Sequence, residues 1–389
     1  MTTTRPASLA TVSKPAYGGL HSPRARALKT LVIAALVAAT TLAAAAPGAT
    51  GRSDEKKKPA NGKSAAPATD RDPVWPLPPE PARIRYVTSY RGANDFSAKK
   101  KSSGWKTLVF GRDSTAPEAP DTLVKPYGVA AGTDGRVYVS DTASRRVFVF
   151  DAERRTVSFL GDRQPAKLAK PTGVAVDASG TVFVADATHN RIFGFAPTGE
   201  FVIAIGRDGD LESPAGMAID ADRQLLYVAD SRKHQVFCFS TTDGAAVRTI
   251  GRRGSEPGEF NFPTNVSVDK EGRLYVTDTL NFRIQSFDPD GAPLGAFGTL
   301  GDTPGSLNRP KGIGVDDEGH IYVADTSFNN FQIFDREGQL LLFVGSVGSG
   351  PGEFFLPAGL FIDRRNRVYV VDQGNARVQV FQYLRAPAR

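Results

Sequence analysis

The sequence predicts an all-β fold, a six-bladed β-propeller that occupies residues 83–389 of the 389-residue chain. Two observations carry this prediction. A proline recurs at intervals of 43 to 49 residues, and each of the first five repeats holds four short runs of alternating apolar residues separated by Asp, Pro and Gly. Four antiparallel strands in a repeat of this length are typical of one propeller blade. The six prolines are Pro126, Pro171, Pro214, Pro263, Pro310 and Pro357.

An aspartate and an aromatic residue keep register with these prolines. The aspartate stands 15 or 16 residues after each proline, at the end of the second predicted strand, and the aromatic residue stands just before it. This aspartate begins a turn, where its carboxylate can accept backbone N–H bonds, and an arginine five residues later can return to it. Six equivalent catalytic sites are implausible, so we interpret these residues as framework and the aromatic residues as packing between blades. The aspartates are Asp141, Asp186, Asp230, Asp278, Asp325 and Asp372, and the arginines are Arg146, Arg191, Arg283 and Arg377.

The sixth repeat ends after three strands, whereas the first five end in a fourth strand and a glycine. A lone strand of the same pattern, residues 83–92, precedes the first repeat. Placing it as the outer strand of the last blade closes the ring and leaves only short, protected sheet edges. Residues 93–125 then form a long connection into the first blade, which we expect to be either a functional segment or a plain cover over the channel edge.

Five segments resemble NHL repeats. They are residues 186–192 (DATHNRI), 278–285 (DTLNFRIQ), 372–379 (DQGNARVQ), 254–260 (GSEPGEF) and 350–354 (GPGEF). The resemblance covers residues 83–384 and implies a six-bladed NHL propeller of the exported bacterial type. NHL propellers serve many purposes, so the resemblance implies no single activity. The first, third and fifth blades depart from the Asn-x-Arg part of the motif, which argues against a surface function repeated in every blade.

The basic charge of the chain lies before the repeats. Residues 1–80 hold 11 Lys+Arg and 5 Asp+Glu, whereas residues 81–389 hold 37 and 36. An almost neutral propeller lacks the basic face that RNA binding needs, so we expect no nucleic-acid partner. Cys238 is the only cysteine, which excludes an intramolecular disulfide and a thiolate-rich metal site.

Residues 1–46 have the layout of an export signal. Arg24, Arg26 and Lys29 precede an apolar run at residues 31–46, and small residues follow it. The run is shorter than the ~20 residues of a typical spanning helix, so an uncleaved membrane anchor is the alternative. Residues 47–82, rich in Ala, Pro and Lys, predict a disordered linker. We therefore expect an exported, periplasmic or extracellular monomer.

Candidate binding residues are those that differ between blades around the mouth of the central channel. In a propeller, the turns between second and third strands share this face with the connections between blades. The positions near the axis are Tyr127, Thr172, Ala215, Asn265, Lys311 and Ala358. The positions farther out are Arg145, His189, Lys233, Phe282, Phe328 and Asn329, together with Trp105 of the long connection.

We expect this face to bind a protein, peptide or envelope polysaccharide without catalysis, cofactor or metal. The alternative is a propeller hydrolase or lyase, of the lactonase or lyase type, and an RNA-binding NHL protein is least favoured. His21 lies in the leader, and His189, His234 and His320 occupy different positions of their blades, so no three-histidine zinc site is predicted. The axial positions also lack the carboxylates that a lactonase-type calcium ion would need.

Overall fold

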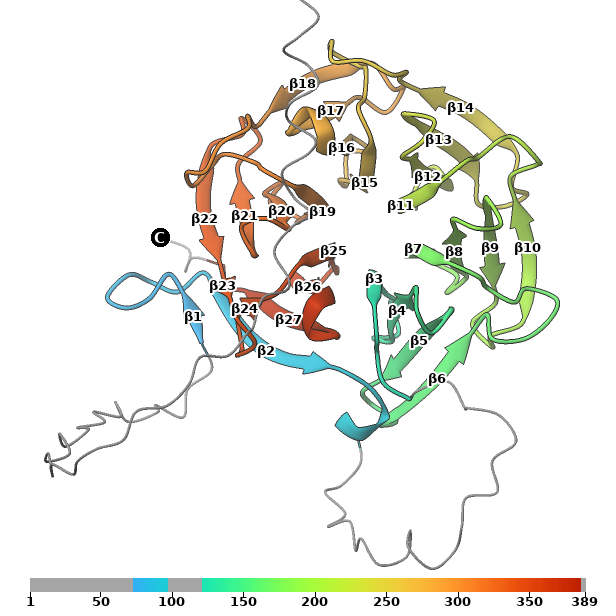
Figure 1. Cartoon of the computed structure of the whole chain (residues 1–389), viewed down its shortest axis with the longest axis horizontal. Helices are drawn as coiled ribbons and strands as arrows, with labels where there is room; N and C mark the ends of the chain where they lie inside the picture. The colour runs from blue at the N-terminus through green and yellow to red at the C-terminus, as the bar shows by residue number, and fades with distance from the viewer. Residues whose placement is uncertain (1–72, 97–120, 386–389) are drawn as a thin grey trace, which may run out of the picture. The chain divides into compact units, whose positions relative to one another are not determined.

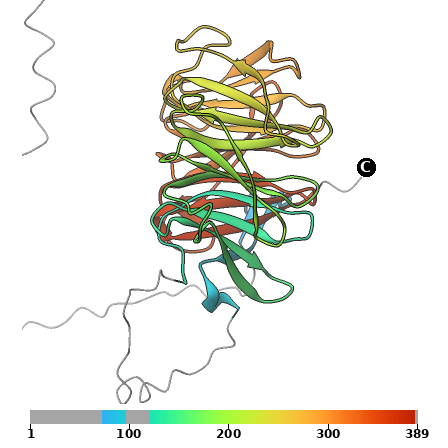
Figure 2. The same cartoon turned by 90° about the vertical axis from the view of Figure 1, so that its right-hand side faces the viewer.

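The computed structural model describes residues 73–96 and 121–385, which form six β-sheets arranged as the blades of a propeller (Figure 1). A two-stranded parallel sheet of β23 (Ser346–Val347) and β24 (Glu353–Phe354) lies in the connection between the fifth and sixth blades. Within each blade the first strand lies nearest the central channel, and later strands follow outward. Figure 2 shows that the strands run between two faces, so that the turns gather on those faces. The predicted fold class and number of blades are confirmed.

The strands follow the predicted repeat. Blade 1 comprises β3 (Pro126–Ala131), β4 (Val137–Asp141), β5 (Arg146–Asp151) and β6 (Thr156–Leu160). Blade 2 comprises β7 (Pro171–Val176), β8 (Val182–Asp186), β9 (Arg191–Phe195) and β10 (Phe201–Ile205). Blade 3 comprises β11 (Pro214–Asp220), β12 (Leu225–Asp230), β13 (Gln235–Ser240) and β14 (Ala246–Ile250). Blade 4 comprises β15 (Pro263–Val268), β16 (Leu274–Asp278), β17 (Arg283–Phe287) and β18 (Pro293–Phe297). Blade 5 comprises β19 (Pro310–Val315), β20 (Ile321–Asp325), β21 (Asn330–Phe334) and β22 (Leu340–Val344).

The N-terminal strand closes the ring, as the repeat count predicted. Blade 6 contains β25 (Pro357–Ile362), β26 (Arg367–Asp372) and β27 (Arg377–Tyr383), and its next strand outward is β2 (Ile84–Tyr90). β2 pairs antiparallel with β27. The two ends of the described chain therefore share one sheet.

The last residues of the segment predicted as linker contact the propeller. Strand β1 (Val74–Trp75) pairs with β2, and the Trp75 ring packs edge-on against Phe381 with centroids 5.8 Å apart. This packing removes apolar surface of the indole from water, which favours the attachment of β1 to blade 6. The predicted export signal and most of the predicted linker lie outside the described residues. Among the residues that are described, no helix is long and apolar enough to cross a membrane.

The repeated aromatic residues pack between blades, as predicted, and each is at most 3% exposed. In blades 4 to 6 they also make a polar contact that the sequence did not suggest. Tyr275, Tyr322 and Tyr369 each donate a hydrogen bond of 3.1 Å from the phenol to an aspartate that follows the first strand. Burial raises the pKa of Tyr275 to about 12, so the phenol remains a donor at all ordinary pH values.

Neighbouring first strands come very close to one another at the glycine of each Pro-x-Gly element. A Cβ atom added to Gly173 would lie 2.1 Å from the Ala215 carbonyl oxygen, and one added to Gly128 would lie 2.5 Å from the Thr172 carbonyl oxygen. Side chains cannot be accommodated at such distances. The glycines therefore form a narrow waist in the channel, which separates its two ends.

Candidate functional site

The repeated aspartates hold the turns of the channel-mouth face in place. All six are fully buried. In blade 1, the Asp141 carboxylate accepts the backbone N–H groups of Val124 and Lys125, at 2.7 and 2.9 Å, and those of Ala143 and Ser144, at 3.0 and 2.8 Å. One side chain thereby joins the incoming connection to the turn after the second strand. These contacts are those expected of a residue that supports the turn.

Backbone donors also set the ionisation of Asp186 in blade 2. Burial raises the pKa of its carboxyl, but N–H donation from His189, Ala169 and Lys170 outweighs burial and holds the pKa below its ordinary value. A charged carboxylate that accepts several backbone N–H bonds is stabilised in its ionised form. Asp186 is consequently held as a charged acceptor for the backbone around it.

The predicted return of the arginine to the aspartate occurs in blades 4 and 6. Arg283 Nε lies 2.9 Å from Asp278, and Arg377 Nε lies 2.7 Å from Asp372. Arg283 also donates to the carbonyl oxygens of residues 256 and 259, which ties down the 254–260 loop.

The other two predicted arginines make different contacts. Arg191 pairs with the exposed Asp208 at 2.7 Å. The Arg146 guanidinium carbon lies 3.6 Å from the centroid of the Phe159 ring. The arginine is therefore a full framework partner in two blades rather than four.

Two bulky residues at the starts of first strands, on the channel-mouth face, have a left-handed backbone. Phe262 has φ +59° and Leu356 has φ +56°, and both directly precede the proline that begins a first strand. Such φ values are uncommon for large side chains. The Phe262 N–H donates to His234 Nδ1 at 3.0 Å, and the Leu356 N–H donates to Asn329 Oδ1 at 2.9 Å. Both side chains remain about 40% exposed.

Four further exposed apolar side chains lie in blades 4 and 6 or in the connections that leave blades 4 and 5. The Leu280 N–H donates to the carbonyl of the residue before Phe262, so Leu280 and Phe262 form an exposed pair on blade 4. Phe355 and Leu356 form a second pair on blade 6. Leu300 and Val347, at 60% and 66% exposure, lie in the connections that leave blades 4 and 5. We refer to these six residues as the apolar face.

The predicted axial residues do not form one group. Tyr127 and Lys311 are half-buried on the side of the waist that faces the channel mouth. Burial lowers the pKa of the Lys311 ammonium, and the charges of Arg309 and Lys125 lower it further. Asn265 lies at the waist itself and borders the opposite half of the channel.

The predicted outer residues lie around the edge of the same face. Lys233 donates to the carbonyl of Gly209, and Asn329 binds the backbone of Leu356. Arg145 is exposed, and Phe282 and Phe328 are half-buried. Trp105 and residues 97–120 lie outside the described residues.

The three histidines of the propeller have separate partners. His189 Nδ1 lies 3.3 Å from Asp186, His234 accepts the Phe262 N–H, and His320 Nδ1 lies 2.9 Å from the Asp316 carboxylate. Within residues 73–96 and 121–385, no group of three or more His, Cys, Asp or Glu side chains has the spacing of metal ligands.

A cavity of about 480 Å³ occupies the end of the channel away from the predicted mouth. The first strands of the blades and the turns that follow them line it, and three arginines from the 363–367 turn of blade 6 lie at its edge. Sequence reasoning missed this site, although Asp363-Arg-Arg-Asn-Arg367 differs visibly from the Asp-x-x-Gly turns of blades 2, 4 and 5. It also missed Phe262 and Leu356, which stand where the other four repeats have Lys, Ser or Arg before the proline.

Comparison with known proteins agrees with this architecture. Residues 217–296 and 307–383 match the family model DUF5128, a 6-bladed beta-propeller, and residues 88–207 match an SMP-30/gluconolactonase/LRE-like region. A stretch of 93 residues is 33% identical to NHL repeat-containing protein 2 of Gallus gallus, over 21% of this chain and 13% of that protein. The chain is a six-bladed β-propeller, and part of it is similar to an NHL-repeat protein. It spans only a small part of the length of this curated relative.

The solved structures of three other proteins share the fold of this propeller. Virginiamycin B lyase from Staphylococcus aureus has a TM-score of 0.50 and 14% identity, with 67% of this chain and 96% of that chain covered. A gluconolactonase from Xanthomonas campestris has a TM-score of 0.53 and 18% identity, with 67% and 87% covered. An auxiliary nutrient binding protein from Bacteroides thetaiotaomicron has a TM-score of 0.54 and 14% identity, with 68% and 70% covered. At these identities the likeness concerns the fold, which lyases, lactonases and binding proteins use alike.

Proposed function

We propose that this propeller is an exported, non-catalytic recognition module that binds an extended polypeptide segment on its apolar face. The observation that carries the proposal is the exposure of Phe262 and Leu356 on left-handed backbone. A strained backbone conformation of this kind costs about 1–3 kcal/mol, and a side chain that stays about 40% exposed offsets that cost only in part. The remaining cost is explained if the two side chains are buried by a partner.

The amount of apolar surface supports binding. Full burial of one Phe, Leu or Val side chain contributes roughly 1.5–3 kcal/mol. Six such side chains lie on blades 4 to 6, each between 39% and 66% exposed. Association itself costs several kcal/mol, so a ligand must cover most of the apolar face to bind well. A segment that crosses all three blades meets this requirement.

The chemistry of the apolar face favours a polypeptide over a polysaccharide. Four of the six residues, Leu280, Leu300, Val347 and Leu356, are aliphatic. They offer neither a flat ring for stacking on a sugar nor hydrogen bonds for its hydroxyl groups. Apolar side chains of a peptide can cover them without burying unpaired polar atoms.

Substitution by glycine tests this function sharply. Glycine adopts positive φ without steric cost, so the double variant Phe262→Gly/Leu356→Gly should fold at least as well as the wild type. It should nevertheless lose at least tenfold in affinity for the peptides that the wild-type chain selects from a displayed peptide library. The matched control is Val247→Ala/Leu341→Ala, which alters two similarly exposed side chains on the outermost strands of blades 3 and 5. Equal binding by the glycine variant, or selection of glycans but no peptides from parallel arrays, would refute the proposal.

A further inference from the structure

The cavity at the far end of the channel is separate from the apolar face. Its volume of about 480 Å³ lies in the range of small-molecule sites in proteins. The glycine waist stands between the cavity and the mouth residues Tyr127 and Lys311, neither of which borders it. A ligand held here would be small and would not compete for the surface proposed above to bind a peptide.

All six blades contribute one apolar side chain to a ring inside the cavity. These residues end the apolar run of each first strand. Each is half-buried: it packs partly against an apolar cluster and also borders the cavity. They are Ala131, Val176, Ile219, Val268, Val315 and Ile362. The ring is suited to bind the apolar part of a ligand, because displacing water from apolar side chains is thermodynamically favourable.

The edge of the cavity carries positive charge on one side. Arg364, Arg365 and Arg367 lie there, with Asp363 and Asp177 as the carboxylates that border the cavity. Asp363 binds Arg367 at 3.2 Å, and Asp177 accepts hydrogen bonds from residues of its own turn. In the described part of the chain, the guanidinium groups of Arg364 and Arg365 have no carboxylate partner.

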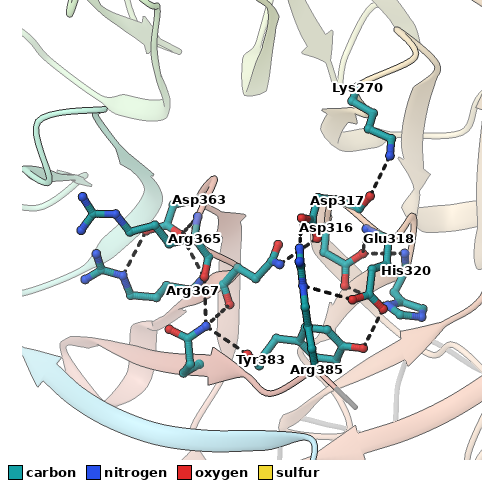
Figure 3. A network of polar contacts seen from close by, with 12 residues as sticks. Lys270, Asp316, Asp317, Glu318, His320, Asp363, Arg365, Arg367, Tyr383 and Arg385 are labelled. Carbon is teal, nitrogen blue, oxygen red and sulfur yellow. Dashed lines mark hydrogen bonds and ion pairs between the residues drawn. The ribbon is translucent and has the colours of Figure 1, made fainter. Parts of the chain in front are cut away.

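The acidic residues of the neighbouring turn in blade 5 are already engaged. Asp317 accepts a 2.7 Å hydrogen bond from Asn366 and pairs with Arg385, and Glu318 accepts a 3.0 Å hydrogen bond from Tyr383. Figure 3 shows Arg365 and Arg367 extending toward blade 1, away from this network. The two unpaired arginines are thus free to meet an anion, and guanidinium groups bind carboxylates in a bidentate manner.

A polar side chain stands at the inner end of the cavity. Asn265 replaces the glycine of the Pro-x-Gly element, and a Cβ atom added to Gly216 would lie 2.1 Å from its Oδ1 atom. Among the described residues its amide has no hydrogen-bond partner. The cavity therefore presents cations at its edge, an apolar ring in the middle and an uncharged polar group at the waist.

From this order of groups we infer that the cavity binds a small organic carboxylate, with the carboxylate at Arg364 and Arg365 and its apolar body within the ring. This site extends the role of the propeller beyond the peptide recognition proposed above, since it would bind a second ligand independently of the peptide. Neutral molecules of the same shape lose the contact with the arginines. Carboxylates without an apolar body lose the contact with the ring.

Calorimetric titration of the full chain with octanoate, octanamide and acetate tests the inference. Octanoate should bind at least tenfold more tightly than octanamide, because one hydrogen-bonded charge contact is worth about one order of magnitude in affinity. It should also bind at least tenfold more tightly than acetate, because acetate lacks the apolar body that contacts the ring. The double variant Arg364→Gln/Arg365→Gln should weaken octanoate binding by tenfold or more and leave octanamide unchanged. Both arginines are exposed, so the variant should fold.

Two controls complete the test. Arg154→Gln removes an arginine that is 77% exposed on blade 1 and does not border the cavity, and it should bind octanoate as the wild type does. The variant Phe262→Gly/Leu356→Gly should also keep octanoate binding, so failure at one site is distinguishable from failure at the other. Equal affinity for octanoate and octanamide, no binding of octanoate at millimolar concentration, or an unchanged affinity in the Arg364→Gln/Arg365→Gln variant would overturn the inference.

Discussion

Replacing Ile84 by alanine measures how firmly the N-terminal strand closes the ring. Ile84 is fully buried, and it packs in a cluster that joins blade 6 to blade 5 and includes Tyr322 and Phe381. An Ile→Ala change at a closed core position costs roughly 2–5 kcal/mol. We expect about 3 kcal/mol here, since strand pairing on both sides of β2 hinders collapse of the site. For a domain of this size that is a fall in Tm of roughly 6 °C.

The matched control is Val87→Ala in the same strand. Val87 is 41% exposed, so its truncation should change the free energy of unfolding by no more than about 0.5 kcal/mol. Both variants are compared by calorimetric melting, and Trp75 fluorescence reports on the closing sheet because its indole packs on Phe381. If Ile84→Ala melted at the same temperature as Val87→Ala, strand β2 would not belong to the cooperative core.

Two further predictions concern charged side chains of the framework. Asp278→Ala should cost roughly 3–5 kcal/mol in urea unfolding, because it leaves Arg283 without its buried partner, whereas Asp290→Ala, at a side chain 97% exposed, should cost almost nothing. The hydrogen bond to Asp316 raises the pKa of the His320 imidazole above its ordinary value of 6.5, so its stabilising effect is complete below that pH and is lost as pH rises through the folded-state pKa. The Tm difference between wild type and His320→Asn should therefore shrink from about pH 6 to about pH 9, and a constant difference would contradict this assignment.

The fold could be predicted from sequence because its determinants recur. Six prolines, six aspartates and six buried aromatic residues in one register identify the blades, and the missing strand of the last repeat identifies the closure. The position of β1 on the closing sheet could not be predicted in this way. Its contacts, the pairing with β2 and the packing of Trp75 on Phe381, occur once in the chain and therefore leave no period in the sequence.

The candidate sites were harder to predict for the same reason. Comparing the repeats removed Asp278 and Arg283 from the list of functional candidates, and the two residues pair with each other at 2.9 Å. The same comparison retained Asn265 as an exception, which the structure places in the lining of the cavity. The position of the cavity along the channel depends on side-chain packing, and no spacing rule in the sequence encodes it.

The two ends of this propeller differ because the repeat constrains them differently. On the channel-mouth face of blades 4 and 6, the aspartate accepts a backbone N–H of the incoming connection and side-chain N–H groups of the following turn. Residues beside it, Phe262 and Leu356, can therefore take unfavourable conformations without loosening the turn. At the other end the turns are held mainly by their own Asp-x-x-Gly hydrogen bonds, as in the turns at Asp269 and Asp316. The turn at Asp363 keeps those bonds while replacing glycine with Asn366. The other positions of this turn can therefore carry arginines without weakening its hydrogen bonds. Charge is thus the property in which the blades differ around the cavity, whereas the exposure of apolar side chains is the property in which they differ around the channel mouth.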